Sequence, residues 1–134
     1  MRFLTAILTT CLVSSPLLAR DQRKVHRTHA DPAYSAALQA ADRFLHAWQT
    51  QDHEAGIMML SDHARELVSP DQLQQFFAPD ANAAFEIEHG GRRKSGAYVF
   101  PVVLFGASSA HRVHFGEIVI VRSGKDDWAV ERLP

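Results

Sequence analysis

The stretch that decides the fold is "AYVFPVVLF", residues 97–105. β-branched and aromatic residues fill it, and glycines flank it on both sides, which is typical of a strand between turns. Both of its alternating sets of side chains are apolar, whereas a strand with one face in water alternates apolar and polar residues. We therefore expect both faces to be covered, one by helices and the other by a second copy of the chain.

Pro101 lies in the middle of this predicted strand. Proline has no N–H to donate to a neighbouring strand, so the strand is expected to be bulged or to lie at a sheet edge there. A bulge bends a sheet and makes its inner face concave. The prediction is a curved sheet with room for a cavity beneath it.

Three further runs, 84–90, 116–122 and 128–133, also have strand patterns. In the first, Phe85 and Ile87 alternate with glutamates, which indicates one face in water. The motif "HFGEI" leaves open a bulge at Gly116. The short turns "GRRKSG" and "SGKDD" separate the runs, so the four predicted strands form an antiparallel meander.

The preceding part of the chain predicts three helices. Asp31 is a good N-cap and Pro32 suits the first helical position. The first helix then has one apolar stripe, made of Tyr34, Ala37, Leu38, Ala41, Phe44, Leu45 and Trp48. A second helix follows Asp52 and restarts or bends at Ser61 or Asp62. A third begins at Ser69 with a capping box to Gln72. Helices followed by strands define the class as α+β, with three N-terminal helices packed on a curved four-stranded antiparallel sheet.

The first segments are predicted to lie outside this domain. Residues 1–19, "MRFLTAILTTCLVSSPLLA", have a basic start, a short apolar run and a small-residue cut site, the pattern of a secretory signal peptide. The only cysteine, Cys11, is expected to leave with it, although a lipid-modified cysteine is the alternative. Residues 20–30 form a flexible basic leader, and residues 31–134 form the domain. The mature protein is expected in the periplasm or the extracellular medium, with no membrane attachment after cleavage.

Three stretches carry a resemblance to a known superfamily: "AADRFLHAWQTQDHEAGIMMLSD" at 40–62, "ELVSPDQLQQFF" at 66–77 and "DDWAVERL" at 126–133. They resemble the nuclear transport factor 2-like superfamily, a cystatin-like α+β cone that includes secreted domains of unknown function. The resemblance covers about residues 33–133. Members of the superfamily include isomerases, dehydratases, hydrolases, binding proteins and accessory domains, so it implies a fold and a cavity rather than one chemistry.

Two hypotheses for the function follow. The favoured one is a non-catalytic ligand-binding or accessory domain that holds a small apolar ligand in a pocket lined by aromatic residues: Tyr34, Trp48, Tyr98, Phe100 and Trp128. The alternative is a small enzyme, an isomerase or hydro-lyase, which uses an inward histidine such as His114 with a nearby acid, or Tyr98 as a hydroxyl donor.

Several other partners are not expected. The eight histidines are scattered, and no three have metal-ligand spacing, so neither a metal nor another cofactor is predicted. A formal net charge of -1 argues against nucleic acid. The basic turn "GGRRKSG" has two interpretations, an anion or partner site and a solvated hairpin tip.

Overall fold

The computed structural model describes residues 31–108 and 112–134, and it has an α+β fold, as predicted. The proposed signal peptide, Cys11 and the leader lie outside the described residues. The helices and strands follow one another along the chain as α1 (Pro32–Gln49), α2 (His53–Met58), α3 (Asp62–Leu67), α4 (Pro70–Phe76), β1 (Ala84–Ile87), β2 (Gly91–Arg92), β3 (Tyr98–Phe105), β4 (Val113–Arg122) and β5 (Trp128–Arg132).

Side-chain caps start each of the four helices in the described residues. Asp31, Asp52, Ser61 and Ser69 each accept a backbone N–H of the first turn, and Ser69 forms the predicted capping box with Gln72. The predicted second helix is divided into α2 and α3. The helix is interrupted because the residues between α2 and α3 form backbone hydrogen bonds with β5 instead of continuing the helix.

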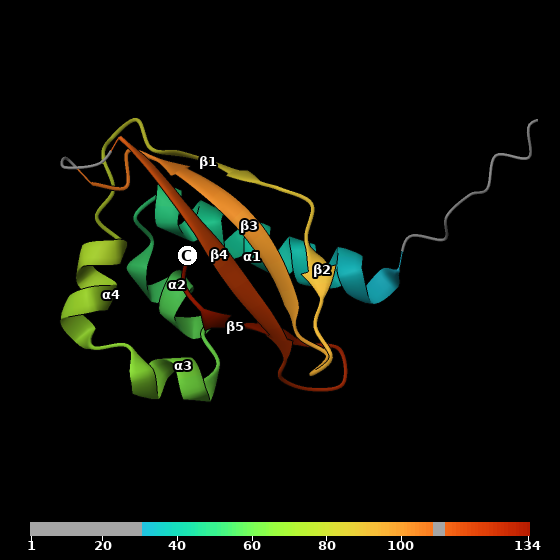
Figure 1. The fold of residues 1–134 in the computed structure, drawn as a ribbon. Helices are drawn as coiled ribbons and strands as arrows, with labels where there is room; N and C mark the ends of the chain where they lie inside the picture. Colours follow the sequence, from blue (N-terminus) through green and yellow to red (C-terminus); the bar gives the residue numbers. More distant parts are fainter. Residues whose placement is uncertain (1–30, 109–111) are drawn as a thin grey trace, which may run out of the picture.

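The strands form one antiparallel sheet in the order β1-β3-β4-β5, and the short β2 pairs with the other end of β3. Figure 1 shows α1 running behind β3 and β4. The predicted four-stranded meander is present. The structure adds the short strand β2, and β4 begins at Val113 rather than at Gly116. A bulge at Gly116 was one interpretation of the sequence, but Gly116 pairs in register with Val102. The irregularity lies between Val119 and Ile120, where β4 meets β5.

Pro101 is neither at a sheet edge nor at a bulge, so that prediction was wrong. It lies in the central strand β3 and pairs in register with Glu117 of β4. The Pro101 carbonyl accepts the Glu88 N–H at 2.8 Å, and in a strand the N and C=O of one residue point to the same side. The missing donor therefore faces the gap between β1 and β2, where no ladder bond is needed.

The core lies between the helices and one face of the sheet, which we call the inner face. It is made of the buried apolar residues Ala37, Ala40, Ala41, Phe44, Leu45, Ala47, Trp48, Leu60, Ala64, Leu73, Phe77, Ala83, Tyr98, Phe100, Val102, Leu104, Ile118, Ile120 and Val130. The helices therefore cover one side of β3, as expected from its sequence.

The opposite side, which we call the outer face, is also largely apolar. By alternation along the paired strands it carries Val99, Pro101, Val103, Phe105, Val113, Phe115, Val119, Val121 and Ala129. Phe115 is 76% exposed, although it lies among these apolar neighbours. Among the described residues, no helix is long and apolar enough to cross a membrane.

Candidate ligand-binding groove

Four of the five predicted pocket residues form one aromatic cluster near the start of α1. The ring centroids of Tyr34 and Phe100 are 5.4 Å apart, those of Tyr34 and Tyr98 are 5.9 Å apart, and those of Tyr98 and Trp128 are 5.5 Å apart. Trp48 lies 14 residues after Tyr34 on α1, roughly 21 Å along the helix axis at 1.5 Å per residue. The five residues therefore do not line a single cavity.

Tyr34 and Phe100 hold the fold together around a kink between β1 and β2. Phe100 is fully buried. The Gly90 N–H donates to the Tyr34 hydroxyl at 3.2 Å, and His89 Nδ1 lies 3.2 Å from the same oxygen. This hydroxyl ties the first turn of α1 to the chain that leads into β2.

Tyr98 forms the one tyrosine–carboxylate pair among the described residues. Its hydroxyl donates to Asp31 Oδ2 at 2.6 Å, while Asp31 Oδ1 accepts the Ala33 N–H at 3.0 Å. The bond from Tyr98 is the main cause that lowers the pKa of Asp31, and the same bond raises the pKa of Tyr98. Asp31 therefore stays ionised and Tyr98 stays protonated near neutral pH. The pair braces the start of α1 against β3 and is poorly suited to exchange a proton.

This pair predicts how Tyr98→Phe changes acid stability. The folded pKa of Asp31 lies below its ordinary 3.8, so the bond stabilises the fold above pH 3.8, and this contribution is lost as pH falls through the lower folded value. The pKa of Tyr98 is raised above 10.0, so its contribution is present below pH 10 and is lost as pH rises through the folded value. The variant should be less stable than the wild type at pH 5–9, and the difference should shrink below pH 3.8.

Urea denaturation across a pH series measures this difference. The control is Tyr34→Phe, whose hydroxyl contacts Gly90 and His89 instead of a carboxylate. The loss of stability caused by Tyr34→Phe should not become smaller as Asp31 becomes protonated. If the loss of stability caused by Tyr98→Phe stayed constant down to the lowest pH, the bond between Tyr98 and the ionised Asp31 would be contradicted.

A groove lies beside Trp128, and we call it the Trp128 groove. It has two adjoining chambers that share Val121, Arg122 and Trp128. The helix chamber, about 580 Å³, is lined by Arg43, Met58, Met59, Leu60, Ser61, Asp62, Arg65, Val121, Arg122, Ser123, Asp127, Trp128 and Ala129. The hairpin chamber, about 530 Å³, is lined by Ala33, Arg92, Ser95, Gly96, Ala97, Tyr98, Val121, Arg122 and Trp128.

Backbone pairing positions the helical wall of the groove. The Ser61 N–H donates to the Val130 carbonyl at 2.9 Å, and the Val130 N–H donates to the Met59 carbonyl at 2.8 Å. Leu60 thereby forms a parallel bridge with Val130 on the free edge of β5. The segment between α2 and α3 is fixed to the sheet, so its side chains form a stable wall.

Arg122 and Trp128 separate the two chambers. They pair directly across the β4–β5 hairpin, and the Arg122 guanidinium lies 5.0 Å from the centroid of the Trp128 ring. Arg122 Nη1 also donates to the Lys125 carbonyl at 3.2 Å. These two contacts hold the guanidinium in place before any ligand arrives.

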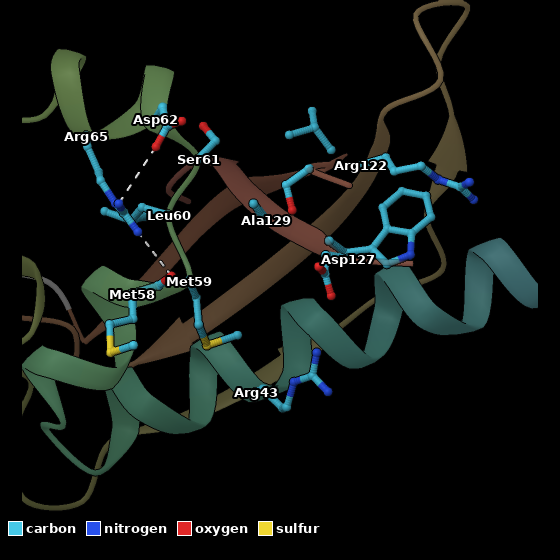
Figure 2. A pocket seen from close by; sticks show the side chains of 13 residues that line it. Arg43, Met58, Met59, Leu60, Ser61, Asp62, Arg65, Arg122, Asp127 and Ala129 are labelled. Carbon is cyan, nitrogen blue, oxygen red and sulfur yellow. Dashed lines mark hydrogen bonds and ion pairs between the residues drawn. The ribbon is translucent and has the colours of Figure 1, made fainter. Parts of the chain in front are cut away.

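The two chambers differ in charge. In the helix chamber, Arg65 Nη1 lies 3.7 Å from Asp62 Oδ1, its Nη2 donates to the Met58 carbonyl at 3.2 Å, and Asp127 adds a second acid (Figure 2). The hairpin chamber is lined by Arg92 and Arg122 and by no acidic residue. The Arg92 guanidinium makes no hydrogen bond or ion pair with another side chain in the described ranges, and its backbone pairs with Tyr98 in the sheet. The hairpin chamber is therefore the more basic of the two.

The sequence prediction missed the arginines and methionines of this groove. One signal was available, because a hairpin closed by "SGKDD" places Arg122 opposite Trp128 on neighbouring strands. The basic turn that was considered as an anion site supplies Arg92. The contribution of Met58 and Met59 depended on the pairing with β5, which no local pattern indicates.

His114, the alternative catalytic residue, lies at a different place. With Trp48 it lines a smaller pocket of about 250 Å³, together with Phe76, Leu104, Ala107, Ser108 and Pro134. His114 is exposed and, among the described residues, has no carboxylate partner. The indole N–H of Trp48 is buried and has no hydrogen-bond partner in the described part of the chain. His111 lies outside the described residues.

The other histidines near acids belong to helix surfaces and corners. His46 Nε2 lies 3.6 Å from Asp42 Oδ2, the predicted exposed pair one turn apart. His63 Nδ1 lies 2.5 Å from Glu131 Oε1, and the Ser61 hydroxyl contacts the other oxygen of Glu131. Because the glutamate separates the serine from the histidine, the imidazole cannot activate that hydroxyl. Within residues 31–108 and 112–134, no cluster of three potential ligands is placed to hold a metal ion.

No family model, no curated protein and no solved structure matches this chain. The geometry of the Trp128 groove is therefore the basis on which a function can be argued.

Proposed function

We propose that this domain is a non-catalytic ligand-binding module of the nuclear transport factor 2-like kind, which holds a small molecule in the Trp128 groove. The observation that carries the proposal is the position of Trp128, whose ring lies on the boundary of two adjoining chambers. Each chamber falls within the 300–1,000 Å³ typical of small-molecule sites. Tyr98 and Trp128, both in the predicted aromatic set, line the hairpin chamber.

The candidate catalytic residues favour binding over chemistry. The Asp31 carboxylate is occupied by Tyr98 and a backbone N–H, which makes it a weak base. His114 has no acid to orient it within the described ranges. An isomerase or hydro-lyase remains the alternative, but it has less support because a general base should lie within hydrogen-bond reach of a reacting proton and be tuned toward neutral pH.

The proposed cellular location is the periplasm or the extracellular medium. It rests on the signal-like pattern of residues 1–19. A ligand for this domain would then be a molecule found outside the cytoplasm.

Native mass spectrometry of protein recovered from its own periplasm or medium tests the binding proposal. We expect a fraction of the wild-type protein to carry a retained small molecule, and Trp128→Ala to lose it. The control is Phe115→Ala, which removes an exposed aromatic ring on the outer face and should leave the retained mass unchanged. Wild-type protein that carries no small molecule, or Trp128→Ala protein that retains the same mass, would count against a binding role for the groove.

We also propose that two copies of the domain associate through the outer face. An interface with twofold symmetry brings the same patch together with itself, so the patch must not repel itself. Around the apolar centre, Arg132 Nη2 donates to Glu117 Oε2 at 2.9 Å and Arg93 Nη2 lies 3.7 Å from the same oxygen. Glu86 adds a second acid to this face, because it pairs with Val103. Two acids balance two bases, so the outer face is suited to meet a second copy of itself.

A further inference from the structure

We infer that the ligand of the Trp128 groove is an amphipathic anion, whose carboxylate or phosphate group binds in the hairpin chamber and whose apolar body lies across Trp128 into the helix chamber. This inference rests on the proposed binding function and adds the chemistry and the direction of the ligand.

The hairpin chamber has the groups that an anionic head group needs. Arg92 and Arg122 both line it, and Ser95 adds a hydroxyl. Guanidinium groups bind carboxylate and phosphate through paired, charge-assisted hydrogen bonds. Arg122 is already held by Trp128 and by the Lys125 carbonyl, so little conformational entropy is lost when an anion binds.

The nearest competing acid does not neutralise this chamber. Asp31 lies close enough to Arg92 for the arginine to lower its pKa slightly, but it does not line the chamber. Its two oxygens are bonded to the Tyr98 hydroxyl and the Ala33 N–H. With two guanidinium groups against one occupied carboxylate, the local charge stays positive.

The helix chamber offers apolar contacts along one side, although charged and hydroxyl side chains form more of its lining. The side chains of Met58, Met59 and Trp128 supply these contacts, whereas Leu60 is buried in the core and Val121 and Ala129 belong to the outer face. Met58 is 73% exposed, which is unusual for so apolar a side chain and leaves its thioether free to adjust to a ligand.

The acids of the helix chamber set the direction of the ligand. Asp62 and Asp127 both line it, and Figure 2 shows Asp62 paired with Arg65. A head group placed there would meet acids as well as bases, whereas in the hairpin chamber it meets only bases. The anionic end is therefore assigned to the side of Arg92.

Isothermal titration calorimetry with a short set of probes, each below its micelle concentration, tests the inference. Decanoate and decyl phosphate carry both parts of the ligand, 1-decanol lacks the charge, and acetate and inorganic phosphate lack the chain. We expect one or both of the two amphipathic anions to bind at least about tenfold more tightly than 1-decanol, and the short anions to give no measurable heat. The tighter of decanoate and decyl phosphate identifies the head group as a carboxylate or a phosphate.

Variants locate the binding site on the protein. Arg92→Gln and Arg122→Gln should each lower the affinity for the tighter probe by about tenfold. This corresponds to about 1.4 kcal/mol, the lower end for a hydrogen bond to a charged group. Lys94→Gln is the matched control, because it removes the same charge from the same turn but does not line either chamber. Its affinity should remain within about twofold of the wild type, and circular dichroism should show all three variants folded.

The outcomes separate this inference from the proposed function. Equal affinity for decanoate, decyl phosphate and 1-decanol, with no effect of either arginine variant, overturns the anionic head group but leaves a ligand-binding groove. Equal losses in Lys94→Gln and Arg92→Gln overturn the site and indicate a diffuse charge effect. No binding of any probe, together with no retained molecule in the native protein, removes the proposed function itself.

Discussion

Gly90→Ala should lower the free energy of unfolding by about 3 kcal/mol, whereas Gly91→Ala at the next position should change it by no more than about 0.5 kcal/mol. A Cβ on Gly90 would lie 2.3 Å from the Val99 carbonyl oxygen and 2.4 Å from Phe100 Cδ1. The first contact is backbone of a central strand and the second belongs to a fully buried ring, so neither atom can move away cheaply. A Cβ on Gly91 meets no heavy atom within 4 Å.

The consequences of Gly90→Ala extend to the Trp128 groove. The Gly90 N–H is bonded to the Tyr34 hydroxyl, and the Tyr34 ring packs on Tyr98, which lines the hairpin chamber. Urea denaturation of both alanine variants measures the expected difference. Equal stability of the two variants would mean that the kink between β1 and β2 is not as tightly packed as the contacts indicate. Since small domains are stable by about 5–15 kcal/mol, a loss of about 3 kcal/mol is readily measured.

Features that depend on short stretches of sequence could be predicted. The caps at Asp31, Asp52 and Ser69 combine a polar acceptor with a following turn of helix, and each is present. The apolar runs that became β3 and β5 are equally local. The α+β class follows from these patterns without any knowledge of distant contacts.

Features that depend on pairing between distant residues could not be predicted in the same way. Pro101 looked like an edge or bulge residue, because the sequence does not tell which neighbouring strand is interrupted opposite its missing N–H. The sequence predicted that the helix restarts or bends near Ser61. It did not predict that Ser61 pairs with Val130, which lies 69 residues later. The ring of Phe77 occupies the space beside Gly56, and no local pattern in the sequence indicates this contact.

The same distinction applies to the candidate site. Aromatic residues could be identified as pocket candidates, and Tyr98 and Trp128 do line the groove. Their partners Arg92 and Arg122 come from two different hairpins. Arg92 belonged to a basic turn with two interpretations, and Arg122 ended a predicted strand. Hairpin register brings Arg122 onto Trp128, and the pairing of Arg92 in β2 with Tyr98 in β3 brings Arg92 to the same chamber. Each residue of this site has an ordinary explanation in its local sequence. The site can therefore be recognised only once the pairing of the strands is known.

The second prediction with a large expected effect concerns the outer face. Phe115→Glu should raise the dissociation constant of the proposed homodimer by about 100-fold or more. The substitution removes an exposed ring whose burial contributes about 1.5–3 kcal/mol, and in a twofold interface the loss occurs twice. The new carboxylate would also lie on the face that carries Glu86 and Glu117, so it adds repulsion within each copy and across the interface.

Light scattering after size-exclusion chromatography measures this effect over a range of protein concentrations. The wild type should show a dimer at micromolar concentration, and Phe115→Glu should elute as a monomer. Leu67→Glu is the matched control, because Leu67 is 67% exposed and lies on α3 rather than on a strand of the outer face. It should leave the dimer intact. A wild type that is strictly monomeric, or equal dissociation in both glutamate variants, would exclude the outer face as the interface. The apolar character of both sides of β3 would then need another cause, such as a partner protein that replaces the second copy.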